Sequence, residues 1–217
     1  MSKKYSTKNH VVLIANGSFP KKNRPLQIIN DAEYIICCDG AANSMYKTNK
    51  EADIIIGDLD SIDSKYLKNV KSQTISIENQ NDNDLRKALN WIAKNIKVKK
   101  ITIIGITGLR EDHTLGNIAS FLYNKYDFEI EIITDTGLFY IIREFKTIQT
   151  SIGQPISLFC IDEKQRISTE GLKYKLENDS INLYNATLNI AEKKQITISL
   201  KLDIPVLVYL YCENEKN

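Results

Sequence analysis

The 217-residue sequence lacks the cysteine patterns of metal-binding and disulfide-stabilised proteins. Its four cysteines are the adjacent pair Cys37 and Cys38 and the distant Cys160 and Cys212, so there is neither a CxxC pair nor a disulfide framework. Reduced thiols in a cytoplasm are therefore expected. Residues 1–9 are polar, and no apolar run approaches the roughly 18 residues needed to span a membrane. We expect a soluble cytoplasmic protein with no membrane partner.

An excess of charge of one sign is also missing. Lys and Arg together number 29 against 27 for Asp and Glu, which gives a formal net charge of +2. Such a balance argues against a dedicated nucleic-acid-binding protein. The hydrophobic content of 42% is enough for a real core at this length, and the length itself indicates one large or two small domains.

Three sequence motifs of well-known nucleotide-binding and hydrolytic enzymes are absent. The sequence contains no GxxxxGK[ST] phosphate loop and no GxGxxG fingerprint, which argues against a P-loop kinase and a dinucleotide-binding domain. It also has no GxSxG elbow, which argues against serine hydrolase chemistry.

The first part of the chain alternates short β-branched runs with segments of helical periodicity. Strands are expected at 11–15, 34–38, 53–56, 73–77, 101–106 and 129–134. Helices are expected at 41–47, 63–70, 83–96 and 112–125, the last with Leu115, Ile118, Ala119 and Leu122 at core spacing. This alternation predicts an α/β domain, residues 1–135, whose sheet is largely parallel and flanked by helices.

The second part, residues 136–217, has strand-like segments and no helical stripe. These segments lie at 138–150, 156–161, 181–186, 195–201 and 206–212, and turn clusters such as 177–179 separate them. The pattern predicts an antiparallel sandwich or barrel. The apolar run 206–211 has too few neighbouring residues to cover both of its faces, so a symmetric dimer is expected.

Polar residues follow the expected parallel strands and would meet at one rim of the sheet, where ligands of such folds bind. They are Asn16, Asp39, Asp58, Asp60, Gln80, Asp82, Asp84, Arg110, Asp112 and His113. An acidic rim repels phosphate unless a cation intervenes, and carboxylate oxygens suit Mg²⁺. Asp58 and Asp60 are the best metal candidates, because their mutual repulsion costs stability unless a cation or partner offsets it.

Each rim residue also has an ordinary structural interpretation. A single Asp after a strand is often a turn former or helix cap, and Asp84 with Lys87 can be a surface ion pair. Arg110, after two glycines and before a helix N-terminus, is suited to grip phosphate oxygens, whereas His113 could equally cap that helix. The position of these residues at the rim of the sheet is what favours a functional role over a structural one.

Four segments in order resemble the thiamine pyrophosphokinase family: 39–43 (DGAAN), 53–61 (DIIIGDLDS), 80–89 (QNDNDLRKAL) and 105–117 (GITGLREDHTLGN). Residues 171–176 (GLKYKL) add a match in the β-rich part. The resemblance implies a catalytic ATP- and Mg²⁺-binding α/β domain, a C-terminal β-sandwich that binds thiamine and dimerises, and a homodimer. The implied reaction transfers diphosphate from ATP to the hydroxyethyl group of thiamine, giving thiamine diphosphate and AMP.

The resemblance also implies roles for individual residues. The implied metal ligands are Asp39, Asp58 and Asp60. The implied catalytic residues are Asp58, Asp60, Asp84, Arg110 and Asp112. The implied ATP contacts are Asn16, Asp39, Ser61, Lys87, Arg110, His113 and Asn117. The implied thiamine contacts are Gln80, Asp84, Tyr174 and Asn189.

Three residues depart from the family pattern. Asn83 stands where Thr or Ser is usual, Leu109 replaces a glycine, and Leu188 replaces a serine next to Asn189. Neither of the first two changes removes a charge that the reaction needs. Two alternatives stay open: a Mg²⁺-dependent phosphotransferase or nucleotide hydrolase with another acceptor, and a non-catalytic sensor of thiamine or nucleotide.

Overall fold

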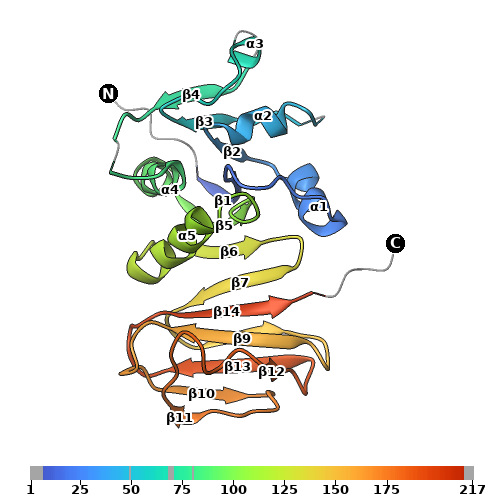
Figure 1. Ribbon diagram of the computed structural model, residues 1–217, viewed down its shortest axis with the longest axis vertical. Helices are drawn as coiled ribbons and strands as arrows, with labels where there is room; N and C mark the ends of the chain where they lie inside the picture. The colour runs from blue at the N-terminus through green and yellow to red at the C-terminus, as the bar shows by residue number, and fades with distance from the viewer. Residues whose placement is uncertain (1–6, 49, 68–70, 80, 213–217) are drawn as a thin grey trace. The chain divides into compact units, whose positions relative to one another are not determined.

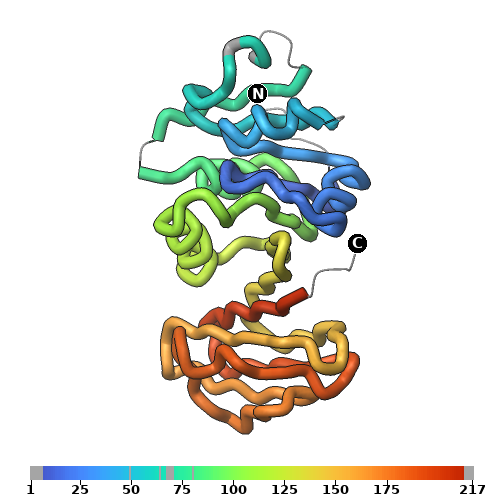
Figure 2. The backbone as a smooth tube through the Cα atoms, turned by 45° about the vertical axis from the view of Figure 1, so that its right-hand side comes forward, coloured from blue at the N-terminus to red at the C-terminus, as the bar shows by residue number. Residues whose placement is uncertain are grey.

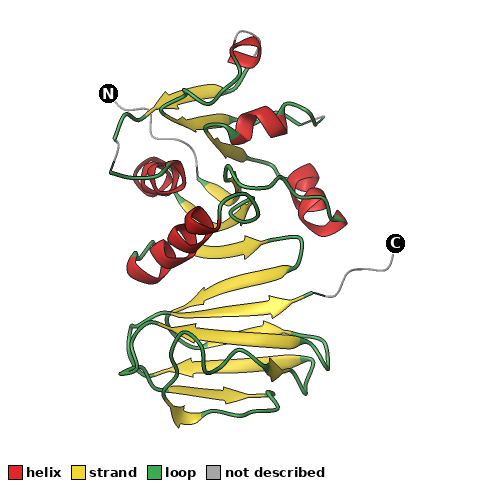
Figure 3. Cartoon of the chain, in the orientation of Figure 1, coloured by secondary structure: helices red, strands yellow, loops and turns green. Residues whose placement is uncertain are grey.

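The computed structural model describes residues 7–48, 50–67, 71–79 and 81–212. The chain forms two compact units, Met1–Asp135 and Thr136–Asn217 (Figure 1, Figure 2). In the described part of the chain, helices of at least four residues occur only in the first unit (Figure 3). None of them is long and apolar enough to cross a membrane. The expected α/β fold with an antiparallel second part is confirmed.

The first unit is built on a parallel sheet of six strands in the order β6-β5-β1-β2-β3-β4. The strands are β1 (Lys8–Ile14), β2 (Ile35–Cys38), β3 (Ile54–Gly57), β4 (Gln73–Ser76), β5 (Val98–Ile104) and β6 (Glu129–Ile133). Every residue of β2 and β3 is buried, as expected for strands covered on both faces. All six strands were predicted, with small differences at their ends.

The helices of this unit are α1 (Asn23–Asp31), α2 (Ala41–Met45), α3 (Ser64–Leu67), α4 (Asp84–Asn95) and α5 (Glu111–Tyr123). The stripe predicted for α4 is mostly confirmed: Leu85, Ala88, Leu89, Ile92 and Ile96 are buried, whereas Ala93 is exposed. The prediction for α5 was partly wrong, because Leu115 is 70% exposed. Helix α1 was not predicted; of its nine residues only Pro25 and Ile29 are buried. Residues 68–70 of the expected helix 63–70 lie outside the described residues.

The second unit is an antiparallel sandwich. Strands β12 (Asn189–Ile190), β9 (Pro155–Cys160), β14 (Val206–Tyr211) and β7 (Gly137–Ile142) pair in that order. The facing sheet has the order β11 (Glu177–Asp179), β10 (Ile167–Glu170), β13 (Gln195–Leu200) and β8 (Lys146–Gln149). Buried residues from both sheets, among them Ile148, Leu158, Ile198 and Val208, form one core.

Several predictions for this unit were wrong in detail. The segment 138–150 is two strands rather than one, and 181–186 is a loop in which Asn182 Oδ1 accepts hydrogen bonds from the backbone N–H groups of Tyr184 and Asn185. Such a side-chain turn competes with strand pairing. The cluster 177–179 is not a turn alone but the short strand β11. Strands β10 and β12 were not predicted.

Candidate active site

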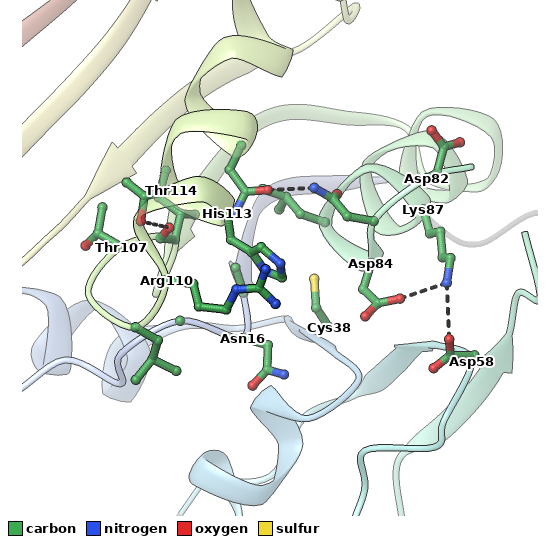
Figure 4. Close-up of a pocket in the computed structure, with 17 residues that line it drawn as sticks. Asn16, Cys38, Asp58, Asp82, Asp84, Lys87, Thr107, Arg110, His113 and Thr114 are labelled. Atoms are coloured by element: carbon green, nitrogen blue, oxygen red, sulfur yellow. Dashed lines mark hydrogen bonds and ion pairs between the residues drawn. The ribbon is translucent and has the colours of Figure 1, made fainter. Parts of the chain in front are cut away.

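The candidate site lies where the connections of the parallel sheet change direction. Strand β1 pairs with β2 on one side and with β5 on the other, so the chain segments after β1 and β5 leave the sheet beside one another. Ligands of open parallel sheets bind at such a switch point. A cleft of about 400 Å³ is present there, and Asn16, Asp58, Asp84, Arg110 and His113 are among its lining residues (Figure 4).

Three carboxylates form a cluster at this edge. Asp39 follows β2, Asp58 follows β3, and Asp60 lies two residues further on; each offers an oxygen atom, and the three oxygens lie within 4.8 Å of one another. Asp39 is 1% exposed, and its Oδ1 is buried without a hydrogen-bond partner among the described residues. A Cβ on Gly57 would lie 2.5 Å from the Cβ of Asp39, so only glycine at the end of β3 leaves room for this side chain.

The pKa of Asp39 reflects this environment. Burial raises the pKa above its ordinary value; a hydrogen bond involving Ser61 works in the opposite direction, and the negative charges of Asp84, Asp58 and Asp60 raise it further. A bound cation would offset both the burial and the repulsion. The cluster therefore has the chemistry of a divalent metal site.

The loop that carries Asp58 and Asp60 is tied to helix α2. Asn43 Nδ2 donates to the Ser61 carbonyl at 2.8 Å, and Asn43 Oδ1 accepts from the Asp63 N–H at 2.9 Å. The Ser61 hydroxyl donates to Asp60 Oδ1 at 2.9 Å. Asn43 belongs to the 39–43 motif, yet sequence reasoning gave it no role, because only the fold brings it to this loop.

Lys87 joins two of the acidic residues. Its side chain is 4% exposed, and its Nζ lies 2.9 Å from Asp84 Oδ1 and 3.6 Å from Asp58 Oδ2 (Figure 4). Burial opposes the Lys87 charge, but the hydrogen bond and charge of Asp84, together with Asp58, outweigh burial and raise the pKa of Lys87. Partial desolvation works against the Asp58 charge, but Lys87 and hydrogen bonds in the 58–60 loop lower its pKa overall. This is not the weak surface pair that spacing alone allows.

Arg110 and Asp112 form a two-bond pair on the opposite wall. Arg110 Nε donates to Asp112 Oδ1 at 3.1 Å and Nη2 donates to Asp112 Oδ2 at 2.5 Å. The hydrogen bond from Arg110 lowers the pKa of Asp112. The guanidinium has further N–H groups, so it can keep Asp112 and still present donors to an anion. Leu109 has no positive φ, whereas Gly108 has φ +92°, so the unusual leucine needs no strained backbone.

The two candidate residues of the second unit are linked to each other. Asn189 is 5% exposed, and its Oδ1 accepts from the Tyr174 N–H while its Nδ2 donates to the Tyr174 carbonyl. Tyr174 itself is 58% exposed, and Lys173 Nζ lies 5.6 Å from the centre of its ring. The ring can therefore receive a cation on its face.

The structure brings most of the sequence-predicted residues together in the first unit. Those that line the cleft are Asn16, Asp58, Asp82, Asp84, Lys87, Arg110, His113 and Asn117. Asp39 and Asp60 belong to the carboxylate cluster, Ser61 donates to Asp60, and Asp112 is paired with the lining residue Arg110. Gln80 lies outside the described residues. Sequence reasoning missed Cys38, Thr107 and Thr114 as lining residues. Cys38 directly precedes the 39–43 motif, and Thr107 and Thr114 lie within the 105–117 motif, so these positions were the available signal.

A parallel-sheet unit with an acidic, arginine-bearing cleft, followed by an antiparallel sandwich, defines the class as a two-domain α/β phosphotransferase. The sequence matches the thiamin pyrophosphokinase catalytic domain over residues 26–134 and the thiamin pyrophosphokinase substrate-binding domain over residues 137–209. The chain belongs to the thiamin pyrophosphokinase family. This membership supports the ATP-dependent formation of thiamine diphosphate as its activity.

Solved structures of the same fold agree with this assignment. Thiamine pyrophosphokinase from Bacillus subtilis superposes with a TM-score of 0.80 at 21% identity, covering 94% of this chain and 100% of that one. The Candida albicans enzyme gives 0.80 at 18% identity, with 94% and 89% covered. The yeast enzyme gives 0.76 at 22% identity, with 95% and 88% covered. No curated protein matches the chain by sequence.

Proposed function

We propose that this chain transfers diphosphate from Mg²⁺-bound ATP to the hydroxyethyl group of thiamine, giving thiamine diphosphate and AMP. The observation that carries the proposal is the buried Oδ1 of Asp39, which has no hydrogen-bond partner in the described part of the chain and lies beside the carboxylates of Asp58 and Asp60. A hard divalent cation fits this all-oxygen set, and Mg²⁺ is the one that commonly joins carboxylates to substrate phosphates. When bound, the cation neutralises phosphate charge.

The remaining residues of the cleft have complementary roles in the proposal. Arg110 donates hydrogen bonds to phosphate oxygens with its outer N–H groups while Asp112 holds its inner edge. The N–H groups at the start of α5, next to His113, add a favourable anion environment. Both supply positive character where negative charge develops during diphosphate transfer.

Asp84 is the residue that we assign to the attacking alcohol. Its Oδ1 is engaged by Lys87 at 2.9 Å, which leaves Oδ2 to accept the proton of the thiamine hydroxyl. Lys87 orients the carboxylates of Asp84 and Asp58. It therefore acts on ATP through these two residues as well as through its own positive charge. Asn16 and Ser61 complete the proposed ATP contacts.

The second unit is proposed to bind thiamine through Tyr174 and to form a homodimer. An exposed Tyr ring suits the cationic thiazolium or the pyrimidine of thiamine. Four of the six residues of β14 are already buried within the chain, which leaves this strand little apolar surface for a partner. Exposed apolar side chains elsewhere support a dimer instead, namely Tyr174, Leu183, Tyr184 and Leu188. Sedimentation velocity at micromolar concentration tests it, and a monomer that turns over thiamine contradicts it.

One assay tests the reaction against the alternatives. Purified protein is incubated with Mg-ATP, with and without thiamine, and AMP, ADP and thiamine diphosphate are followed together. We expect AMP and thiamine diphosphate in equal amounts, and only with thiamine. Formation of ADP, or turnover without thiamine, indicates a different phosphotransferase or a hydrolase. Thiamine binding without turnover indicates a sensor. The four cysteines are free thiols, which supports carrying out the assay under the reducing conditions of a cytoplasm.

A further inference from the structure

Asn83 makes two side-chain hydrogen bonds of opposite kind at the edge of the cleft. Its Oδ1 accepts from the Arg86 N–H at 3.0 Å, which caps the N-terminus of α4. Its Nδ2 donates to Asn117 Oδ1 on α5 at 2.8 Å. Both asparagines line the cleft, so the contact joins its two helical walls.

The cap determines which way round each amide lies. A backbone N–H can only donate, so the Asn83 atom that faces Arg86 must be the oxygen. The atom of Asn83 that faces Asn117 is then Nδ2, a donor, and its partner on Asn117 must be Oδ1. If the Asn117 amide were turned over, two N–H₂ groups would face each other, and both would lose a partner.

The orientation of the Asn117 side-chain amide is therefore fixed. With its oxygen engaged by Asn83, the amide has Nδ2 left for another partner, and no partner for it is recorded among the described residues. Asn117 also lies one helical turn after His113 on the same face of α5, and His113 lines the cleft as well. Asn117 thus adds a neutral donor beside the positively charged end of the cleft that Arg110 provides.

We propose that Asn83 is a positioning residue, which fixes the Asn117 amide so that Nδ2 donates to a hydrogen-bond acceptor of the bound nucleotide. The inference rests on the proposed function, because it needs a nucleotide in this cleft. The acceptor is either a phosphate oxygen or an acceptor atom of the base or sugar. A Ser or Thr at position 83 would not fix the orientation of the Asn117 amide. Its hydroxyl could donate to the Asn117 oxygen or accept from the Asn117 nitrogen.

Asn83→Asp is the informative substitution. An Asp caps a helix as well as an Asn does, so α4 and the melting temperature should be retained. However, Asp offers Asn117 an acceptor instead of a donor, so the Asn117 amide turns over and presents its oxygen to the nucleotide. We expect binding of Mg-ATP, measured by isothermal titration calorimetry, to weaken about tenfold, the effect of one lost hydrogen bond facing an acceptor.

A double-mutant cycle separates this mechanism from the added negative charge. Asn117→Ala should also weaken Mg-ATP binding about tenfold. Adding Asn83→Asp to Asn117→Ala should change binding less than about twofold, because the amide through which Asn83 acts is gone. Asn81→Asp, which adds the same charge on an exposed turn, is the matched control and should bind like the wild type.

The possible results distinguish the inference from the proposed function. If Asn83→Asp weakens binding equally with and without Asn117, or leaves it unchanged, the inference is overturned while the proposed function stands. If the wild-type protein binds no Mg-ATP, both are overturned. Titration with Mg-tripolyphosphate locates the acceptor: a loss shared with ATP supports a phosphate oxygen, and a loss confined to ATP supports the base or sugar.

Discussion

The side-chain amide of Asn189 holds the main chain of Tyr174 on both sides. Asn189 Oδ1 accepts from the Tyr174 N–H at 3.0 Å, and Asn189 Nδ2 donates to the Tyr174 carbonyl at 2.7 Å. The same Oδ1 accepts from the Ile190 N–H at 2.9 Å. The buried side chain of Asn189 thus fixes the main chain that carries the exposed Tyr174 ring. Asn189 can therefore affect the binding of thiamine through Tyr174 without contacting thiamine itself.

Substitution of Asn189 should affect both stability and thiamine. In Asn189→Ala the backbone groups of Tyr174 lose their partners, which costs about 1–3 kcal/mol of unfolding free energy. We expect a lower melting temperature by calorimetry, a higher KM for thiamine and an unchanged KM for ATP. Ile152→Ala is the matched control: Ile152 is 68% exposed in the same unit and lies outside the proposed thiamine and dimer surfaces, so its truncation should leave the melting temperature unchanged. An Asn189→Ala protein with normal thiamine KM would contradict the positioning role.

Tyr174 is expected to act through its ring. Tyr174→Ala should raise the KM for thiamine about tenfold or more, because a desolvated cation on an aromatic face is worth about 2 kcal/mol, while the KM for ATP changes little. Tyr174→Phe keeps the ring and should stay close to the wild type. Steady-state kinetics with each substrate varied in turn makes the comparison. Equal effects of Tyr174→Ala on both substrates, or loss of the dimer, would indicate a structural role.

The raised pKa of Asp39 leads to a prediction of pH dependence. A carboxyl group whose pKa is higher in the folded than in the unfolded protein binds its proton more tightly in the folded state. Ionisation of the group therefore destabilises the folded protein as the pH rises through the folded-state pKa. Asp39→Asn removes this penalty. In the absence of divalent cations, we expect the variant to melt at a higher temperature than the wild type at neutral pH. The difference should vanish as the pH falls to about 4, near the unfolded-state pKa.

Added Mg²⁺ provides the control for this prediction. It should raise the melting temperature of the wild type by binding only the folded protein, and it should raise that of Asp39→Asn much less. A variant that is less stable than the wild type at neutral pH without cations would show that Asp39 is a structural acceptor rather than a strained ligand.

Asp58 and Asp60 should differ in stability but not in activity. Each substitution by Asn should lower turnover more than about a hundredfold, since even a residue that only supports a metal ligand is worth 10–100-fold. Asp58→Asn also removes a partner of the buried Lys87, so its melting temperature should fall slightly. Asp60 is exposed and, among the described residues, makes no ion pair with Lys87, so Asp60→Asn should melt at or above the wild-type temperature. Near-normal activity in both variants would exclude the metal assignment.

The parallel sheet was predictable because its strands carry a strong local signal. The buried runs of β2 and β3 are continuous and apolar, and each is followed by an Asp that marks the rim. Helix α4 was equally clear from its apolar stripe; Asp82 and Asn83 were both possible caps, and Asn83 is the one that caps it. The second unit was harder, because β12 has only two residues and depends on pairing with β9 for its existence. Such strands are defined by tertiary context rather than by their own sequence.

For the site, the sequence identified residue types but not their contacts. The rim position of Asp84 and Lys87 was predicted, whereas the burial of Lys87 and its second contact, with Asp58, depend on α4 packing against β3. The Asn83–Asn117 bond joins residues 34 positions apart, and nothing in either local sequence indicates it. Spacing along a helix or after a strand is encoded locally, but partners on other elements are not.

Arg110 provides the last prediction, in which geometry and charge are separated. Arg110→Lys keeps the positive charge but loses the planar fork, so it cannot hold Asp112 with two bonds and still present further donors to a phosphate. Loss of one charge-assisted hydrogen bond, about 1.5–3 kcal/mol, should lower kcat/KM for ATP about ten- to hundredfold. Asp112→Asn is the companion variant: it leaves the fork intact but weakens its support, so it should cost less than Arg110→Lys. The pair is exposed, so neither variant should change the melting temperature appreciably. Near-normal kinetics in Arg110→Lys would mean that charge alone suffices and that the fork does not bind phosphate.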